Sequence, residues 1–460
     1  MPSTLDISHP EVSGIKVSDV ERDHLWHPFT QMQEYLQLPE LTIVSGKGGW
    51  LIDQEGNRYL DGNASIWTNV HGHNDPELNQ ALLNQLNQVA HSTLLGVSHP
   101  KATELARVLA RLAPPSLDKV FFTDNGSGAV EVALKLSFQY WQLKNKHTKQ
   151  QVIGLSNSYH GDTFGTMAVG DSGFFHDRFR PWCFKTCHIP APTCQELNGK
   201  SEKGDASESL KALEDLLKDK HAETACVIIE PSVQGAAGMK LLPPGYTAAV
   251  SKLCKKYDVH LICDEVFVGF GRLGSLIIST EENVVPDFIC LAKGLTAGYL
   301  PLAATLVKNE IYDAFLGTYD SRKAFFHGHT FTGNPLGCAV ALENIRKLES
   351  MISTGKLNRS IKLFGTLLEA TFKKHPKVLS LRQRGLTAAI DLDPTAKRCL
   401  NDDYPEIRLG LRVCLEARRH GLLLRPLGNS LLLVPPLCLT EDELTQLVHK
   451  TLASINAVLP

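Results

Sequence analysis

The stretch Leu261–Gly294 reads LICDEVFVGFGRLGSLIISTEENVVPDFICLAKG and contains two short apolar runs, each followed by a charged residue. VHLIC precedes Asp264, and FICLA precedes Lys293. Short, continuous and partly β-branched runs are typical of parallel strands that are buried on both faces. Because the carboxyl ends of parallel strands open on one crevice, we expect the Asp264 and Lys293 side chains to lie in the same site.

An acid and a lysine in one crevice suit pyridoxal 5'-phosphate. The lysine amine can form a Schiff base with this cofactor, and the carboxylate can keep its pyridinium nitrogen protonated. The alternative interpretation is structural, with Asp264 as a cap or turn residue and Lys293 as an exposed lysine at a strand end. These two residues alone leave both interpretations open.

The length, charge and cysteine content of the chain limit the classes of protein to which it can belong. The 460 residues are enough for two or three domains with large cores. Basic residues number 47 and acidic residues 49, in no long run of either sign, which does not favour a nucleic-acid or membrane surface. The 11 cysteines form no C-x-x-C pair, so we expect neither a zinc site nor a disulfide framework, and a cytoplasmic location.

Two further patterns are absent or weak. The first residues lack the basic start and apolar core of a signal peptide, and no run of about 18 apolar residues predicts a transmembrane helix. His71 and His73 lie in the turn VHGHND, and we interpret them as structural residues rather than as a metal pair.

Alternating strand and helix patterns predict an α/β fold, with a large domain built on a mainly parallel sheet flanked by helices and a smaller α+β C-terminal domain. We expect domains at 1–75 (an N-terminal segment packing with the small domain), 76–335 (cofactor binding) and 336–460. The residues before 24 are expected to be loosely ordered, and 193–209 to form a surface loop. The predicted strands are 119–124, 151–156, 224–231, 259–264, 288–293, 302–307, 387–393 and 430–436, with a hairpin within 49–67 and helices at 129–141, 246–258, from Asp75-Pro76 and from Pro335.

Three other strand ends or turns carry groups that the same cofactor needs. Gly126-Ser127-Gly128 follows a strand and begins a helix, where backbone N–H groups can hold a phosphate. Glu131 occupies the position at which a dinucleotide-binding fingerprint has glycine, which disfavours that cofactor. Tyr159 can stack on a flat ring, and Gln234 can face a ring oxygen. Each feature alone has a structural alternative, but together they point to pyridoxal 5'-phosphate.

These residues resemble the class III aminotransferases of pyridoxal-phosphate fold type I. The resemblance is carried by NGSGAVEVALK, YHGDT, IIEPSVQGAAG, ICDEV-x-x-GFGR, LAKGL and HGHTFTGNP, and it covers roughly residues 24 to 450. It implies that Lys293 is the Schiff-base lysine, Asp264 the pyridinium partner and Tyr159 the stacking ring, all catalytic. It further implies that Gly126, Ser127, His160, Gln234, His329 and Thr330 bind the cofactor. Thr330 would reach the phosphate of the neighbouring subunit, which implies a homodimer with shared sites.

Within this class, HLWHPFTQM, VHGH, AHSTLLG, GYLPLA and RPLG are similar to the branch that converts 8-amino-7-oxononanoate into 7,8-diaminononanoate in biotin synthesis. That resemblance implies a substrate site made of Phe29, Trp67, Tyr159, Asp162, Gly328 and Arg425, with Arg425 binding the substrate carboxylate. The alternatives are an ornithine- or 4-aminobutyrate-type enzyme of the same class, or a pseudoenzyme that binds the cofactor without turnover.

The amino donor is indicated by departures from the family pattern. Enzymes of this branch that use S-adenosylmethionine usually carry a tyrosine where this chain has Phe29, a tryptophan pair where it has Ile66-Trp67, and an aromatic residue at Leu427. The chain is more similar to the branch that uses lysine, so we expect lysine as the donor. Phe267, Val268 and Leu273 replace the small residues and threonines usual around GFGR, beside Asp264.

Overall fold

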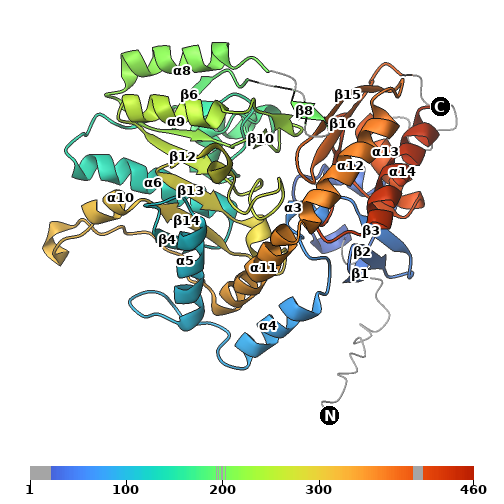
Figure 1. Cartoon of the computed structure of the whole chain (residues 1–460), viewed down its shortest axis with the longest axis horizontal. Helices are drawn as coiled ribbons and strands as arrows, with labels where there is room; N and C mark the ends of the chain where they lie inside the picture. The colour runs from blue at the N-terminus through green and yellow to red at the C-terminus, as the bar shows by residue number, and fades with distance from the viewer. Residues whose placement is uncertain (1–21, 193, 195, 198–199, 202–203, 397–407) are drawn as a thin grey trace.

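The computed structural model describes residues 22–192, 194, 196–197, 200–201, 204–396 and 408–460. A seven-stranded sheet with the order β4-β14-β13-β12-β9-β5-β6 lies among helices in the left-hand half of the molecule (Figure 1). The strands from β13 to β6 are parallel, and β14 is antiparallel to both β13 and β4. The mainly parallel α/β fold is therefore confirmed. The bounds are β4 Lys119–Thr123, β5 Gln151–Leu155, β6 Cys187–Ile189, β9 Thr224–Ile229, β12 His260–Asp264, β13 Phe288–Leu291 and β14 Ala303–Val307.

Both faces of this sheet are covered, which explains why its strands are continuous apolar runs. On β9, Cys226 and Ile228 pack into a cluster with helix α6, whereas Val227 and Ile229 pack into a second cluster with helix α9. Alternate residues of a strand point to opposite faces, so an uninterrupted apolar sequence is needed when both faces are buried. The helices of this part are α4 Pro76–Leu86, α5 Pro100–Leu112, α6 Gly126–Leu143, α7 Phe164–Val169, α8 Ser207–Lys220, α9 Tyr246–Lys256, α10 Asn309–Ala314 and α11 Pro335–Ser353.

The N-terminal strands lie beside the C-terminal helices (Figure 1). Strand β3 pairs in parallel with β17, and the Trp50 indole donates a hydrogen bond of 2.8 Å to Glu443. A second sheet has the order β15-β16-β19-β18. These contacts join residues 50–61 to the C-terminal part, while the expected domains and the packing of residues 1–75 stay predictions. The bounds are α2 Met32–Tyr35, β1 Ile43–Lys47, β2 Trp50–Asp53, β3 Arg58–Asp61, α3 Ala64–Trp67, α12 Lys356–Phe372, β15 Val378–Gln383, β16 Ala388–Leu392, α13 Leu409–Arg419, β17 Leu422–Leu423, β18 Arg425–Leu427, β19 Ser430–Leu433 and α14 Glu441–Val458.

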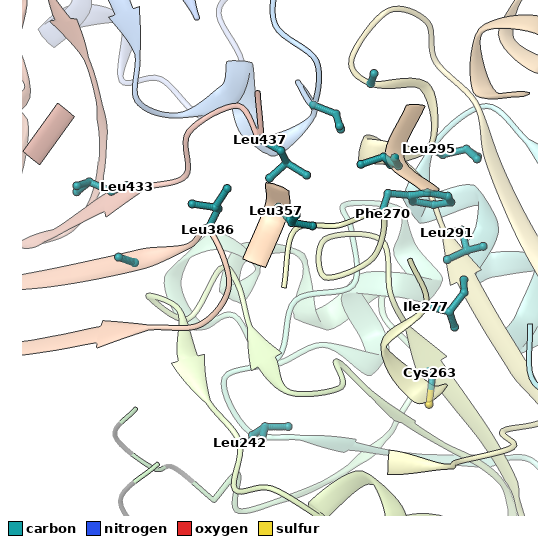
Figure 2. Packing of buried hydrophobic residues seen from close by; sticks show 14 of the residues in the cluster. Leu242, Cys263, Phe270, Ile277, Leu291, Leu295, Leu357, Leu386, Leu433 and Leu437 are labelled. Carbon is teal, nitrogen blue, oxygen red and sulfur yellow. The ribbon is translucent and has the colours of Figure 1, made fainter. Parts of the chain in front are cut away.

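One apolar core runs from the large sheet into the C-terminal part (Figure 2). Phe270 and Leu295 belong to the same cluster of buried side chains as Leu357, Leu386 and Leu437. The loop after β12 is inserted into this core, so the segment carrying Asp264 is fixed from both sides. Within the described part of the chain, no helix has the length and apolar character needed to span a membrane.

Some details differ from the sequence expectations. Leu86 and Phe138 lie at helical spacing from apolar residues of their helices but are 50% and 45% exposed. Within the expected loop 193–209, strands β7 (Glu196–Leu197) and β8 (Lys200–Ser201) form an antiparallel pair, while 193, 195, 198–199 and 202–203 lie outside the described residues. Residues 1–21 of the N-terminal segment also lie outside them.

Candidate active site

The structure brings Asp264 and Lys293 to one crevice. Asp264 ends β12 opposite Cys290 of the parallel strand β13, and Lys293 begins the short 3-10 turn η4 (Lys293–Thr296) just beyond β13. Lys293 has a left-handed backbone with φ of 45°, a conformation that costs a non-glycine residue about 1–2 kcal/mol. The Asn344 amide on α11 donates hydrogen bonds of 2.8 Å to the carbonyls of Gly294 and Leu295, which stabilises this turn.

The Asp264 carboxylate is held at the floor of the crevice. His160 donates from Nδ1 to its Oδ2 at 2.7 Å, and the Val266 amide donates to Oδ1 at 3.1 Å. Nδ1 carries the proton because an ionised carboxylate only accepts hydrogen bonds. The His160 Nε2 atom is buried and has no partner among the described residues. In this structure His160 therefore holds the Asp264 carboxylate, and its own contact with the cofactor stays a prediction.

A second carboxylate, Glu230, is hydrogen-bonded to the backbone of Tyr159. Glu230 accepts hydrogen bonds from the amides of Tyr159 (3.1 Å) and Gly235 (3.0 Å) and thus joins two loops that follow neighbouring strands. Burial raises the pKa of Glu230 to about 7. Burial also lowers the pKa of Lys293, while Asp264 and Glu230 oppose that shift. The amine is therefore easier to deprotonate than an exposed lysine, as a nucleophile requires.

Tyr159 is fixed by two side chains that follow it in the sequence. Its hydroxyl donates to Asp162 Oδ2 at 2.7 Å, and Asp162 Oδ1 lies 3.1 Å from Nε2 of the buried His176. The rings of Tyr159 and His176 stack at 5.7 Å and 26°. Burial acts to raise the pKa of Asp162, but the hydrogen bonds from His176 and Tyr159 bring it below the ordinary value. Sequence analysis missed His176, which stands apart from any of the quoted motifs.

The start of α6 forms a cup of backbone amides. The Asn125 side chain caps the helix by accepting from the Gly128 amide at 2.8 Å. A Cβ on Gly161, which has φ of +128°, would lie 2.0 Å from Ser127 Oγ. Glycine at 161 therefore lets the turn after Tyr159 approach the helix start. A helix N-terminus with a hydroxyl at Ser127 is suited to a phosphate dianion.

These groups surround a cavity of about 420 Å³, a size typical of small-molecule sites. Pyridoxal 5'-phosphate fits this set of groups, because the helix start suits its phosphate, Tyr159 its ring face, Asp264 its ring nitrogen and Lys293 its aldehyde. When bound, the cofactor supplies an electron sink for breaking a bond at the amine-bearing carbon. The predicted residues that line the cavity are Trp67, Gly126, Ser127, Tyr159, His160, Asp264 and Lys293.

Other predicted cofactor residues lie outside this lining. Gln234 is buried and donates to the Ser156 carbonyl at 3.0 Å, while its Oε1 has no partner among the described residues. His329 Nδ1 lies 4.0 Å from Asp124 Oδ2, near the start of α6. Gly328 and Thr330 are exposed on the same loop. Their predicted contacts stay predictions.

Two predicted substrate residues, Phe29 and Arg425, are not among the residues that line the cavity. Phe29 is 55% exposed and makes an edge contact with Phe175. Arg425 begins β18 and is half-buried; burial lowers its pKa, and the nearby Tyr159 opposes that shift. Among the described residues, no hydrogen bond or ion pair engages its guanidinium.

Trp67 enters the cavity from a strained turn. Ser65, Ile66 and Trp67 in α3 have φ of 47°, 64° and 68°, so this segment is a left-handed turn without a glycine. Such a turn costs about 1–2 kcal/mol per residue. Asp61 offsets part of this cost by accepting hydrogen bonds from Ser65 N (3.2 Å) and Ser65 Oγ (2.9 Å), and its Oδ2 also binds His73 at 3.0 Å. His73 thus has a structural partner, as His71 has in the Asn344 carbonyl at 3.3 Å.

Sequence analysis also missed several parts of the cavity wall. Neither Glu230 nor Phe267, one of the departures beside Asp264, was assigned to the cavity from the sequence. The structure puts Phe267 in the wall, in ring contact with Trp67 at 4.6 Å. The segment between Thr296 and Leu302 also lines the cavity; its motif GYLPLA was noticed only through the resemblance.

Comparison with known proteins places the chain in a family. The aminotransferase class-III model matches residues 30–455. The adenosylmethionine-8-amino-7-oxononanoate aminotransferase of Geobacter sulfurreducens is 46% identical over 98% of this chain and 99% of its own length. The structure of the enzyme of that name from Methanocaldococcus jannaschii aligns with a TM-score of 0.88 at 38% identity, covering 96% of this chain and 98% of that one.

A third match bears on the cofactor. The omega transaminase from Pseudomonas jessenii, in complex with PMP, aligns with a TM-score of 0.86 at 28% identity over 96% of this chain and 98% of that chain. The family match, the identities and the cavity built around Lys293 and Asp264 agree with one another. This chain belongs to the class III aminotransferases and is a pyridoxal-phosphate-dependent transaminase.

Proposed function

We propose that this transaminase transfers an amino group to 8-amino-7-oxononanoate and forms 7,8-diaminononanoate for biotin synthesis. The Geobacter and Methanocaldococcus relatives are named for that acceptor. The observation in the structure that supports it best is Arg425, a half-buried guanidinium near Tyr159 that no described residue engages. A substrate with a terminal carboxylate would supply the anion that this guanidinium lacks.

The roles of the other residues follow from their surroundings. Lys293 would move a proton to and from the reacting carbon as general base and acid, since its amine lies in the cavity with a lowered pKa. Asp264, held by His160, would bind the protonated ring nitrogen of the cofactor. Donor and acceptor would bind one after the other at the same site, with the first product leaving before the acceptor enters.

For the amino donor we propose lysine. Phe29 has no hydroxyl, Leu427 no aromatic ring, and one side of Trp67 is in contact with Phe267 at 4.6 Å. A sulfonium with an adenine needs free aromatic faces, and these replacements reduce them. S-adenosylmethionine is the second candidate, because the relatives' names include adenosylmethionine.

A donor screen tests both parts of this proposal. Purified enzyme with pyridoxal 5'-phosphate and 8-amino-7-oxononanoate would be incubated with lysine, S-adenosylmethionine, ornithine or 4-aminobutyrate, and the product identified by mass. We expect diaminononanoate with lysine. Formation of diaminononanoate with S-adenosylmethionine and none with lysine would overturn the proposal that lysine is the donor. A parallel series would supply glutamate semialdehyde or succinate semialdehyde as the acceptor in place of 8-amino-7-oxononanoate. Amination of either semialdehyde, with none of 8-amino-7-oxononanoate, would overturn the proposed acceptor, and no amination of any acceptor would indicate a pseudoenzyme.

Arg425 gives the sharpest test of acceptor binding. We expect Arg425→Lys to raise KM for 8-amino-7-oxononanoate about 10-fold or more, because lysine cannot form the paired hydrogen bonds of a guanidinium. The rate of the donor half-reaction with lysine would serve as the internal control and should change less. An unchanged acceptor KM in this variant would remove Arg425 from the acceptor site.

We also propose a homodimer in which Thr330 completes the partner's phosphate site. Thr330 is exposed, and Phe326 and Phe331 beside it are 75% and 54% exposed, which a partner subunit could bury. Thr330→Glu should place a repelling charge at the phosphate of the other subunit. Mixing and reassociating inactive Lys293→Ala with Thr330→Glu should then restore activity, since one site of the mixed dimer is intact. No restoration, or a monomer in sedimentation, would contradict the shared site.

A further inference from the structure

The Lys293 amine faces two aromatic rings. Its Nζ lies 5.0 Å from the ring centroid of Trp67 and 5.6 Å from that of Phe267. The two rings contact each other at 4.6 Å with an angle of 53° between their planes. An ammonium within about 6 Å of a ring face is attracted by the negative face of the ring. Both rings are therefore within range of one cation.

Neither ring is free to turn away from the amine. The Trp67 indole donates to Asn63 Oδ1 at 3.0 Å, from the left-handed turn that Asp61 stabilises. Phe267 is 7% exposed, and a Cβ on Gly235 would lie 2.9 Å from its Cδ1. The close approach of Gly235 restricts the ring. A side-chain hydrogen bond thus holds Trp67, and a neighbouring backbone segment holds Phe267.

The charged groups that act on the amine come from two other loops. Asp264 at the end of β12 and Glu230 after β9 favour the ammonium, whereas burial disfavours it. An amine that serves as nucleophile and then as proton carrier must pass between its neutral and charged forms at low cost. Ring faces can stabilise the charged form without adding a third carboxylate, which would hold the proton too tightly.

We propose that Trp67 and Phe267 are positioning residues that hold the protonated Lys293 amine against their ring faces whenever it is not linked to the cofactor. The proposal thereby gives a role to Phe267, one of the departures from the family pattern beside Asp264. This inference rests on the proposed role of Lys293 as the cofactor lysine, and it does not depend on which donor or acceptor the enzyme uses.

The variant Phe267→Leu tests the proposal, because leucine keeps an apolar side chain in the wall but has no ring face. The full-length enzyme would be loaded with pyridoxamine 5'-phosphate, which leaves the Lys293 amine unlinked. Lys293 would be acetylated with acetic anhydride at a series of pH values, and the extent of acetylation would be measured by peptide mass. Because only the neutral amine reacts, the pH dependence reports the pKa of Lys293. We expect the midpoint to fall by about half a pH unit in the variant.

Two control variants distinguish the effect of the ring face on the Lys293 pKa from the effect of apolar packing. Phe267→Tyr keeps the ring face and should keep the wild-type midpoint. Leu273→Ile alters the apolar cluster that contains Phe267 and should also keep it. A wild-type midpoint in Phe267→Leu, or an equal shift in Leu273→Ile, would overturn the proposal.

A second readout covers the case in which the reagent reacts poorly or Phe267→Leu folds badly. Trp67→Leu removes the other ring. The rate of a single turnover with any accepted amine donor, followed by cofactor absorbance at a series of pH values, reports the titration of Lys293 in this variant. The midpoint of that profile should shift in the same direction, and an unchanged profile would also overturn the proposal. If Lys293 were not the cofactor lysine, Lys293→Ala would keep its activity, a result distinct from each of these.

Discussion

His160 donates a 2.7 Å hydrogen bond to the Asp264 carboxylate, and both side chains are buried. The pair presents a fixed anion to the position at which the cofactor's ring nitrogen is proposed to bind. Asp264→Asn removes the charge and keeps the shape, so we expect kcat to fall about 10²–10³-fold, the usual cost of losing one charge-stabilising group. Steady-state rates with saturating cofactor measure this. His160→Asn leaves the Asp264 carboxylate in place, so its kcat should fall less than that of Asp264→Asn. A larger fall in the His160 variant would contradict the proposed role of Asp264.

Lys293→Ala should abolish turnover and leave the fold intact. The side chain ends in the cavity, and the turn around it is held by the Asn344 amide rather than by the amine. Circular dichroism and thermal unfolding would check the fold, and a coupled transamination assay the activity. Lys362→Ala, on the exposed side of α12, is the matched control and should behave as wild type. Full activity in the Lys293 variant would refute the proposed site.

Gly161→Ala should weaken cofactor binding. Its Cβ would meet Ser127 Oγ at 2.0 Å and would push the turn after Tyr159 away from the start of α6. Gly56→Ala is a useful comparison, because Gly56 has φ of +82° but open space around it, so that variant carries the backbone strain alone. Equilibrium titration of cofactor into the apoenzyme should show a weaker Kd for Gly161→Ala only. Equal Kd values in the two variants would contradict the close-approach argument.

Glu265 should make stability depend on pH. Burial raises its pKa to about 7, although it accepts hydrogen bonds from the Ile278 amide (2.5 Å) and from the Ser279 amide (2.8 Å) and hydroxyl. A raised carboxyl pKa contributes stability that is complete below the unfolded value and is lost as pH rises through the folded value. The loss attributable to Glu265 therefore falls between about pH 4.5 and 7, at up to ~1.4 kcal/mol per pH unit.

Glu265→Gln removes this titration, so the unfolding temperature of the variant should decline less steeply than that of wild type from pH 5 to 7. Scanning calorimetry with excess cofactor measures both slopes. Glu230, whose pKa is also raised to about 7, remains in the variant and leaves part of the slope. Parallel slopes in the two proteins would show that Glu265 does not titrate in this range.

The sequence predicted the parts of the site that depend on strand ends. Asp264 and Lys293 meet because β12 and β13 are adjacent and parallel, and their apolar runs were sufficient to predict buried strands. The antiparallel direction of β14 could not be predicted in this way, because a strand buried on both faces has the same apolar pattern in either direction.

Other parts depend on contacts between distant segments. The turn at Ala64–Trp67 has no glycine to indicate a left-handed backbone, and its hydrogen bonds to Asp61 become visible only in the folded chain. The same holds for Asn344, whose helix was predicted from Pro335 but whose amide reaches the turn after Lys293. Local patterns thus predicted which residues carry the chemistry better than which residues hold them in place.

The buried Arg272 ties three regions of the chain together. Its guanidinium donates to the carbonyls of Asn69, Leu386 and Pro435, at 3.3, 3.1 and 2.6 Å, while burial lowers its pKa to about 9. Separating these regions would leave a charged group and three carbonyls without partners in an apolar core, which carries a high free-energy cost. The chain is consequently expected to melt as a single cooperative unit, so that damage around Leu386 or Pro435 also disables the pocket, whose lining residues lie between Trp67 and Leu302.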